Sequence, residues 1–275
     1  MGYANFIPTI WSEAIQRELE LNRVFVGDCN RQFEGEIKKK GDQVRILGVG
    51  KPTIHTIASD ARNDDIEGPE EIADNSTTLI VDQIRYFNYM VGDIDKAQSI
   101  GGLMDALSKE SAEALANEED KYIAKMVLEA GKVYEANQAI NEGNVLDVID
   151  KAVEKLYENN VSPSTKLVLT VSPRFNTLFR KAYLGRDTDN SEIMKNGIVG
   201  KYNNVTIKLS NSVHKDGTVD HLMIRTQRAI AFAQQLTEIE AYRPEKKFAD
   251  AVKGLSLFGA KIVRPKEIFD LNVSY

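Results

Sequence analysis

Residue types that could carry chemistry are gathered in a few polar segments of the sequence. One acidic cluster could hold a divalent cation, because carboxylate oxygens bind hard cations; its members are Asp60, Asp64, Asp65, Glu67, Glu70 and Glu71. We favour a charged loop that faces water or a partner for this cluster. Residues 187–192 are also rich in oxygen ligands, but they lack the glycine and the distal glutamate of an EF-hand loop. A metal site is therefore not predicted at either place.

Histidine and cysteine are too sparse for a recognisable catalytic or zinc motif. His214 and His221 flank a turn, His55 stands alone, and no HxxxH or paired-cysteine spacing occurs. Gly48, Gly50 and Lys51 lack the spacing of a Walker A loop, and no GxSxG motif is present. The single cysteine, Cys29, follows apolar residues and is expected to be a buried structural thiol. The sequence thus predicts no catalytic residue, no cofactor and no metal.

Composition excludes several other classes of protein. A length of 275 residues indicates roughly two domains, and 42% apolar with 28% charged residues excludes wholesale disorder. The net charge of −6 excludes the strong basic character of a nucleic-acid-binding protein. The N-terminus has no signal-peptide pattern, and no apolar run approaches the length of a membrane span. We expect synthesis in the cytoplasm.

The longest periodic stretch is residues 100–133, which predict a helix about 50 Å long. Leu103, Leu107, Leu115 and Met126 belong to its apolar face, whereas Glu119 is assigned with other charged residues to the solvated face. Strict heptads fail, so a coiled coil is not favoured. The expected arrangement is a long helix lying across a sheet.

The N-terminal third of the chain predicts arms rather than a compact domain. Residues 12–25 are predicted to form a helix with sparse apolar positions, which packs either on a neighbouring molecule or on its own domain. A short strand at 44–47 and an aromatic-rich strand within 77–92 flank about 25 polar residues without periodicity. These two strands predict an extended hairpin that needs a partner surface.

The C-terminal half predicts a small α/β or α+β domain. A helix is expected at 145–157, a strand buried on both faces at 166–171, and a second helix beginning at Pro173. Val205, Ile207 and Leu209 mark one face of a further strand. The segment 252–265 alternates like a strand and is expected to return to the sheet beneath the long helix.

Two segments in particular resemble the major capsid proteins of tailed bacteriophages, which have the Hong Kong 97-type fold. Residues 77–98 look like the returning strand of the family's extended loop leading into its spine helix. Residues 240–265 resemble a family segment through Tyr242, Arg243 and Pro244, then Lys253–Gly254 and Gly259–Ala260–Lys261. The opening IPTIW and the stretch EGEIKKKGDQVRI also look like one branch of this family.

The resemblance implies an α+β subunit in four parts. These are an N-terminal arm (1–30), an extended β-hairpin loop (31–92), a peripheral domain with a long spine helix on a β-sheet (93–140 and 238–275) and an inserted axial α/β domain (141–237). It also implies candidate contacts between subunits, which are Trp11, Arg17, Lys51, His55, Asp60, Arg62, Asp64, Asp65, Tyr242, Arg243, Glu245 and Lys247. Large interfaces between subunits would bury the arms, which are not expected to be stable alone, against neighbouring copies.

The function implied is self-assembly, as pentamers and hexamers, into an icosahedral phage head around double-stranded DNA. The net negative charge of the subunit would prevent the shell from binding its DNA tightly in one fixed position. Because the chain begins directly at the arm, we expect a separate scaffolding protein, with a portal as a further partner. The three residues of the cross-link found in some relatives cannot all be matched here. An encapsulin-like compartment shell is the alternative, and a metal-dependent α+β enzyme is a remote one.

Overall fold

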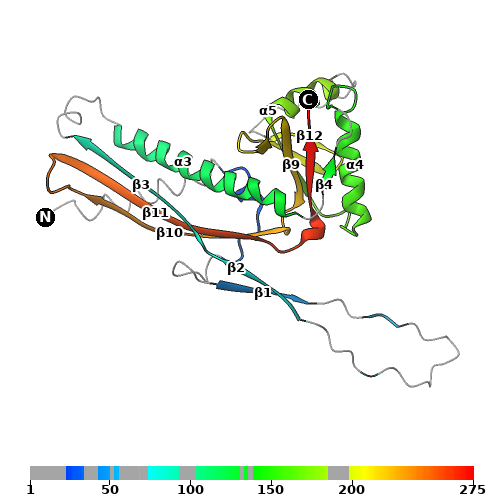
Figure 1. The fold of residues 1–275 in the computed structure, drawn as a ribbon, viewed down its shortest axis with the longest axis horizontal. Coiled ribbons are helices and arrows are strands. Elements are labelled where there is room, and N and C mark those ends of the chain that lie inside the picture. The colour runs from blue at the N-terminus through cyan, green and yellow to red at the C-terminus, as the bar shows by residue number, and fades with distance from the viewer. Residues whose placement is uncertain are drawn as a thin grey trace.

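The computed structural model describes residues 23–33, 43–49, 53–55, 68, 74–92, 103–130, 133–135, 139–184 and 198–275. A long sheet carries one helix, a more rounded α/β part lies at one end of it, and a narrow hairpin projects from the body (Figure 1). The mixed α+β class is therefore confirmed. None of the described helices is both long and apolar enough to span a membrane.

The long sheet has three antiparallel strands in the order β10-β11-β3. Phe87, Tyr89 and Val91 of β3 are turned inward, whereas Tyr86 and Met90 are exposed, which confirms the predicted alternation. Segment 252–265 returns to this sheet as predicted, since β11 pairs with both β3 and β10. The bounds are Gln83–Gly92 for β3, Ile230–Tyr242 for β10 and Ala249–Ile262 for β11.

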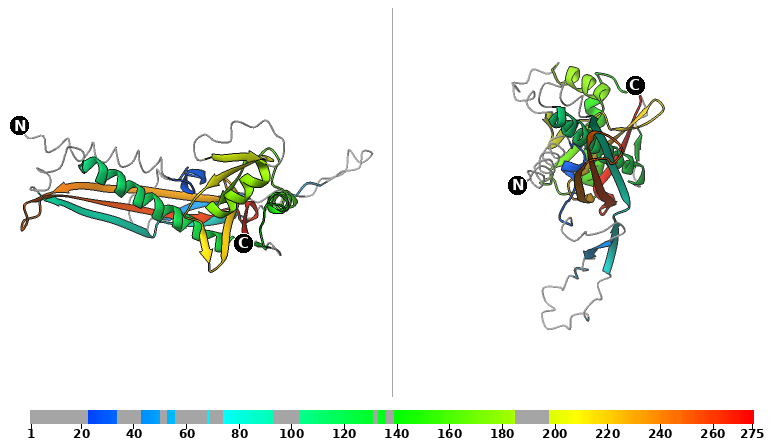
Figure 2. Two further views of the ribbon diagram at one scale, coloured as in Figure 1. Left: turned by 90° about the horizontal axis from the view of Figure 1, so that it is seen from above. Right: turned by 90° about the vertical axis from the view of Figure 1, so that its left-hand side faces the viewer.

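The helix that lies along this sheet, α3 (Leu103–Lys125), is shorter than predicted (Figure 2). It gives way to a 3₁₀ turn, η4 (Met126–Glu129), so its length is about 35 Å rather than about 50 Å. This tighter turn places Met126 and Val127 in succession in the core, with exposed fractions of 5% and 1%. Residues 100–102, where the helix was expected to begin, lie outside the described residues.

The solvated position predicted for Glu119 is wrong. Glu119 and Asp120 have exposed fractions of 0% and 2%, on the same face as Ala112, Leu115 and Ile123. The spacing of these residues is the period of one helical face, so both acids point into the protein. Their partners come from distant parts of the chain and are described below.

The predicted hairpin is formed by β1 (Gln43–Val49) and β2 (Asp74–Ile80). The two strands are antiparallel, with register from Gln43 opposite Ile80 to Val49 opposite Asp74. The base of the hairpin enters a core, where Val44, Ile46 and Leu79 pack with residues of β10 and β11. A Cβ at Gly259 of β11 would lie 2.2 Å from the Ile80 carbonyl oxygen, so the hairpin base approaches this strand very closely.

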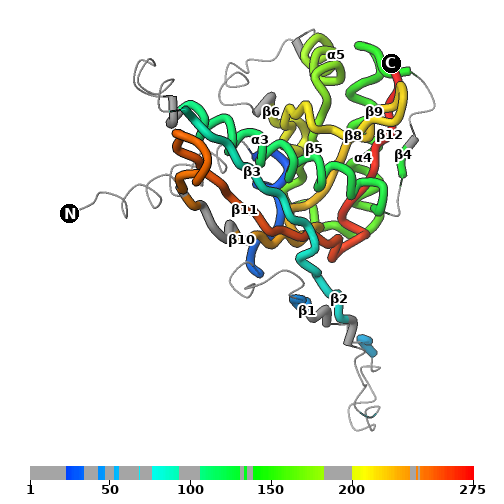
Figure 3. Tube along the Cα trace, turned by 60° about the vertical axis from the view of Figure 1, so that its left-hand side comes forward, coloured from blue at the N-terminus to red at the C-terminus, as the bar shows by residue number. Residues whose placement is uncertain are grey.

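The rounded part is built on a mixed sheet of seven strands in the order β4-β12-β9-β5-β7-β6, with β8 also paired to β9 (Figure 3). Every residue of β5 is buried, as expected, and both predicted helices are present. The bounds are Val133–Glu135 (β4), Val145–Glu158 (α4), Leu167–Val171 (β5), Pro173–Leu184 (α5), Ile198–Tyr202 (β6), Val205–Leu209 (β7), His214–Asp216 (β8), Val219–Thr226 (β9) and Ile268–Val273 (β12). Short 3₁₀ turns are η2 (Val26–Asp28) and η6 (Pro265–Glu267).

Local turn chemistry explains two of the connections in this sheet. Asn203 and Asn204 have φ of 49° and 67° and join β6 to β7, which is the conformation of a two-residue hairpin turn. Gly217, with φ of 59°, performs the same role between β8 and β9. Strand β12 brings the end of the chain between β4 and β9, so residues 268–273 belong to the seven-stranded sheet.

Candidate functional site

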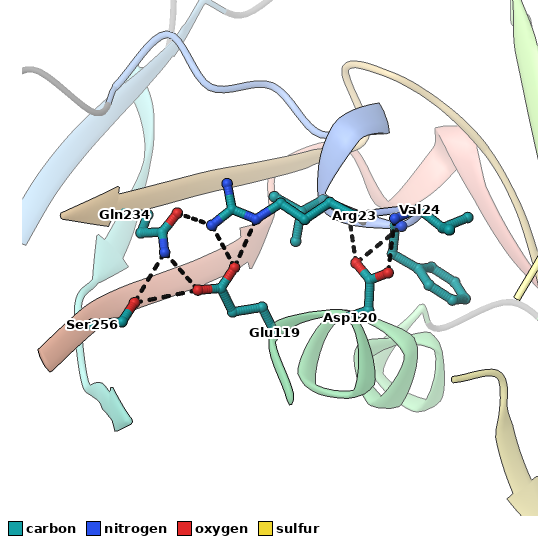
Figure 4. A network of polar contacts seen from close by, with 8 residues as sticks. Arg23, Val24, Glu119, Asp120, Gln234 and Ser256 are labelled. Atoms are coloured by element: carbon teal, nitrogen blue, oxygen red, sulfur yellow. Dashed lines mark hydrogen bonds and ion pairs between the residues drawn. The ribbon is translucent and has the colours of Figure 1, made fainter. Parts of the chain in front are cut away.

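A buried polar network fixes the N-terminal segment 23–30 to helix α3 and the long sheet (Figure 4). Arg23 donates from Nε and Nη2 to Oε2 of Glu119, at 2.8 and 2.5 Å, and also donates to Gln234 of β10. Oε1 of Glu119 accepts from Gln234 at 2.5 Å and from Ser256 of β11 at 3.2 Å. Burial raises the pKa of Glu119, and the Arg23 guanidinium opposes this shift. The network joins four chain segments.

Asp120 holds the same segment by its backbone. Its carboxylate accepts from the backbone N–H groups of Val24, Phe25 and Val26 at 2.8, 3.0 and 3.1 Å. Burial raises the pKa of Asp120, while these three hydrogen bonds favour the ionised form. The side chain therefore serves as an acceptor for donors that no regular element satisfies.

A buried arginine anchors the segment from the opposite side. Arg225 of β9 is fully buried and donates to the carbonyl oxygens of Phe25 and Asp28 at 2.6 and 2.7 Å. It also donates to Sγ of Cys29 at 3.4 Å. Cys29 is 2% exposed, and burial raises the pKa of its thiol, so the prediction of a buried structural cysteine is confirmed.

These buried groups have the geometry of structural anchors rather than of a catalytic centre. Their polar atoms are hydrogen-bonded to one another and to backbone groups. Within the described residues, no group of three or more His, Cys, Asp or Glu side chains could hold a metal ion.

One candidate contact surface is the turn between β10 and β11. Phe248 is 88% exposed there, and the predicted contact residues Arg243, Glu245 and Lys247 are exposed beside it. Tyr242 is only partly buried and donates to Asn88 of β3 at 3.2 Å. The turn therefore places aromatic and charged groups together at the far end of the long sheet (Figure 1).

A second candidate surface is the β1–β2 hairpin, which lies below the long sheet in Figure 1 and projects away from it. His55 is exposed, and its neighbour Ile54 is 90% exposed. The structure thus brings four of the predicted contact residues together at the β10–β11 turn, whereas His55 belongs to the segment that follows β1. The remaining predicted contacts lie outside the described residues; they are Trp11, Arg17, Lys51, Asp60, Arg62, Asp64 and Asp65.

A groove of about 1320 Å³ lies where the hairpin base meets the rounded part. Its lining includes four cationic residues, Arg31, Arg228, Arg264 and Lys266, and one carboxylate, Glu267. Arg264 pairs with Glu267 at 2.9 Å. The groove is therefore a basic surface on an acidic protein, and no local sequence pattern predicts it because its residues come from distant segments.

Comparison with known proteins identifies the fold. The sequence matches no protein-family model and no curated protein. The structure is similar to one from Mycobacterium phage Che8, with a TM-score of 0.74 and 27% identity over 90% of each chain. It is also similar to the capsid of Cyanophage P-SCSP1u, with a TM-score of 0.72 and 14% identity over 92% of this chain and 88% of the other. This chain has the Hong Kong 97-type capsid fold.

A third similar structure is a virus-like particle from Pyrococcus furiosus. It has a TM-score of 0.59 and 11% identity, over 98% of this chain and 100% of the other. The two phage structures named above are thus more similar to this chain than the virus-like particle is, in both TM-score and identity. The predicted resemblance to tailed-phage capsid proteins is confirmed.

Proposed function

We propose that this chain is the major capsid protein of a tailed phage, a structural protein without catalytic activity. Copies would assemble as pentamers and hexamers into an icosahedral head that encloses double-stranded DNA. The chain would be made in the cytoplasm of the bacterial host and would end in the virion. The fold similarity supports the capsid class.

The observation that carries this proposal is the projecting β1–β2 hairpin. Beyond its base it has two strands and an exposed apolar residue, Ile54, but no third strand within the described residues. A two-stranded ribbon is at best marginally stable in water. A neighbouring copy would supply the missing surface, and a hairpin that reaches from one copy to the next gives a heterologous contact that closes rings.

The basic groove suits an acidic segment of a neighbouring copy. The polar segment beyond β1 contains six acids within residues 60–71. Opposite charges on the two surfaces would favour the correct register of subunits and speed their association. The exposed β10–β11 turn, with Phe248, would supply a separate contact.

The four-part division of the chain also belongs to this proposal. Residues 1–30 would be an arm, 31–92 the extended loop, 93–140 with 238–275 the peripheral domain, and 141–237 the axial domain. The pairing of β12 with β9 ties the last strand of the peripheral part to the axial sheet. A separate scaffolding protein and a portal would act with the chain during assembly.

An encapsulin-like compartment is the second candidate, favoured by the likeness to the Pyrococcus furiosus particle. Both candidates predict a closed shell, and the contents distinguish them. A phage head contains double-stranded DNA, whereas a compartment encloses cargo protein.

The test is to express the chain with its neighbouring genes and to examine the purified product by sedimentation and negative-stain electron microscopy. Closed shells, pentamers or hexamers are the expected result, and DNA inside the shells would select the phage head. Shells filled with one cargo protein would select the compartment. A compact monomer under all these conditions would refute assembly altogether.

A further inference from the structure

We propose that His214 and His221 form a binding site for a borderline-soft divalent cation, such as Zn²⁺ or Ni²⁺. His214 on β8 stands directly opposite His221 on β9 in the antiparallel register. Their ring centroids are 5.4 Å apart and the rings are inclined by 48°. Imidazole nitrogen is a preferred ligand of Zn²⁺ and Ni²⁺. Such a site does not depend on shell assembly.

The separation of the two rings matches what a shared metal ion requires. A Zn–N bond is about 2.0–2.1 Å, and a tetrahedral angle between two such bonds places the ring centroids about 5.2 Å apart. The observed 5.4 Å differs from this by less than the usual freedom of a side chain. The paired backbones of β8 and β9 therefore already hold both rings at a separation that one shared metal ion could bridge.

A carboxylate behind His221 orients its ring. Nδ1 of His221 lies 2.9 Å from Oδ2 of Asp270 on β12, and the two side chains are 10% and 2% exposed. With its nitrogen toward Asp270, the amide of Asn272 donates to both carboxylate oxygens at 2.8 and 2.9 Å, and the same nitrogen lies 2.9 Å from Nδ1 of His221, to which it donates in the tautomer whose Nδ1 carries no proton. In the other tautomer Nδ1 donates to Asp270, and the Nε2 lone pair of His221 is then available to a metal. Metal-binding histidines commonly have this second hydrogen bond to a carboxylate.

The positive charge of Lys215, next to His214 in sequence, does not repel a cation bound by the two histidines. Lys215 follows His214 on β8, so its side chain points to the other face of the hairpin. There it lies 3.8 Å from Asp220. Two histidine ligands leave the remaining coordination positions to water, so binding weaker than that of a closed four-ligand site is expected. Such an ion would tie the short edge strand β8 to the main sheet (Figure 3).

The experiment is calorimetric titration of the full-length protein with ZnCl₂ and NiCl₂, with MgCl₂ as the hard-cation control. We expect one Zn²⁺ or Ni²⁺ per chain and no Mg²⁺. His214→Ala should weaken binding at least tenfold, and Asp270→Asn should weaken it by about 10–100-fold. The third histidine of the chain provides the matched control, because His55→Ala should leave the affinity unchanged.

His214→Ala is the substitution that tests the site most clearly, because His214 is only partly buried on a short edge strand. Replacement of His221 would also disturb its buried hydrogen bond to Asp270. Thermal melting of each variant without metal establishes that it is folded, and added Zn²⁺ should raise the melting temperature of wild type and of His55→Ala equally, and that of His214→Ala and Asp270→Asn by less. The proposal is overturned if wild type binds no Zn²⁺ at millimolar concentration. It is equally overturned if His214→Ala retains full affinity or if His55→Ala abolishes binding.

Discussion

Removal of the buried cation beside Glu119 should destabilise the subunit strongly. In Arg23→Met the apolar stem of the side chain is kept, but Glu119 loses its charged partner while both positions remain almost fully buried. Breaking a buried ion pair by removing one partner costs about 3–5 kcal/mol, because the other charge is left uncompensated. For a chain of this size, each kcal/mol lowers the melting temperature by about 2–4 °C, which gives a fall of about 6–20 °C.

The matched control is the neighbouring pair on the same helix. Glu118 lies next to Glu119 in sequence, and Arg85 of β3 approaches it at 3.8 Å with side-chain exposed fractions of 39% and 46%. Exposed pairs contribute about 0–1 kcal/mol, so Arg85→Met should cost far less than Arg23→Met. Urea unfolding of unassembled subunits, followed by circular dichroism, gives the free energy of unfolding of each variant.

The cost of Arg23→Met should also depend on pH. Burial already raises the pKa of Glu119, and loss of Arg23 removes the group that opposes this shift. The folded variant then holds a proton that the unfolded chain has released, so its stability is greatest at acid pH and falls as pH rises above the ordinary carboxyl pKa of about 4.3. The difference from wild type should therefore be larger at pH 7.5 than at pH 5. Equal costs for Arg23→Met and Arg85→Met, or a cost that shrinks as pH rises, would refute this reasoning.

Four further substitutions or treatments test separate parts of the structure. Asp120→Ala leaves three backbone N–H groups without their acceptor and should lower the free energy of unfolding by at least about 1–3 kcal/mol in urea titrations. Gly259→Ala would place its Cβ 2.2 Å from a hairpin carbonyl oxygen and should cost about 1–3 kcal/mol, whereas Gly27→Ala has nothing within 4 Å and should be tolerated. Cys29 should resist a thiol reagent in the folded subunit and react fully after denaturation, because it is buried and its thiol pKa is raised; rapid labelling of native protein would contradict its position. Phe248→Ser should change subunit stability by less than about 0.5 kcal/mol but reduce the assembled fraction in sedimentation, and unchanged assembly would remove this turn from the contact surfaces.

Regular elements with a strong local pattern could be predicted from the sequence. The alternation of Phe87, Tyr89 and Val91 and the apolar run of β5 each reflect the burial of a whole face or of both faces, which is a local property. Helix α4 was predicted to within a residue at its C-terminal end, because its apolar stripe is continuous. The succession of such elements, with the family resemblance, was sufficient for the fold.

The charged anchors could not be assigned in the same way. Arg23 and Glu119 are separated by 96 residues, and Glu119 and Ser256 by 137. A charged residue on a helix is usually solvated. Only the spacing of Glu119, four residues from both Leu115 and Ile123, placed it on the buried face of the helix. The end of α3 was missed for a related reason, since the 3₁₀ turn depends on the core that receives Met126 and Val127 rather than on a local breaker.

Contacts between copies depend on residues of two chains, so a single sequence can only suggest them. The β10–β11 turn groups Tyr242, Arg243, Glu245 and Lys247 as a family resemblance implied, but their role in assembly stays a prediction. Phe248 was not singled out, although an exposed phenylalanine between charged residues at a strand turn is a recognisable sign of a contact.

Hydrogen exchange of the β1–β2 hairpin, measured by mass spectrometry, tests the central claim that other copies of the chain complete this subunit. Peptides that contain residues 47–49 and 74–76, the part of the ribbon beyond the buried base, would be compared between unassembled subunits and purified assemblies. We predict exchange that is fast in the subunit and strongly slowed in the assembly, while β5 is protected in both. Hairpin exchange that is equally slow in the isolated subunit would mean that the hairpin is stable without a neighbour, and would contradict the account.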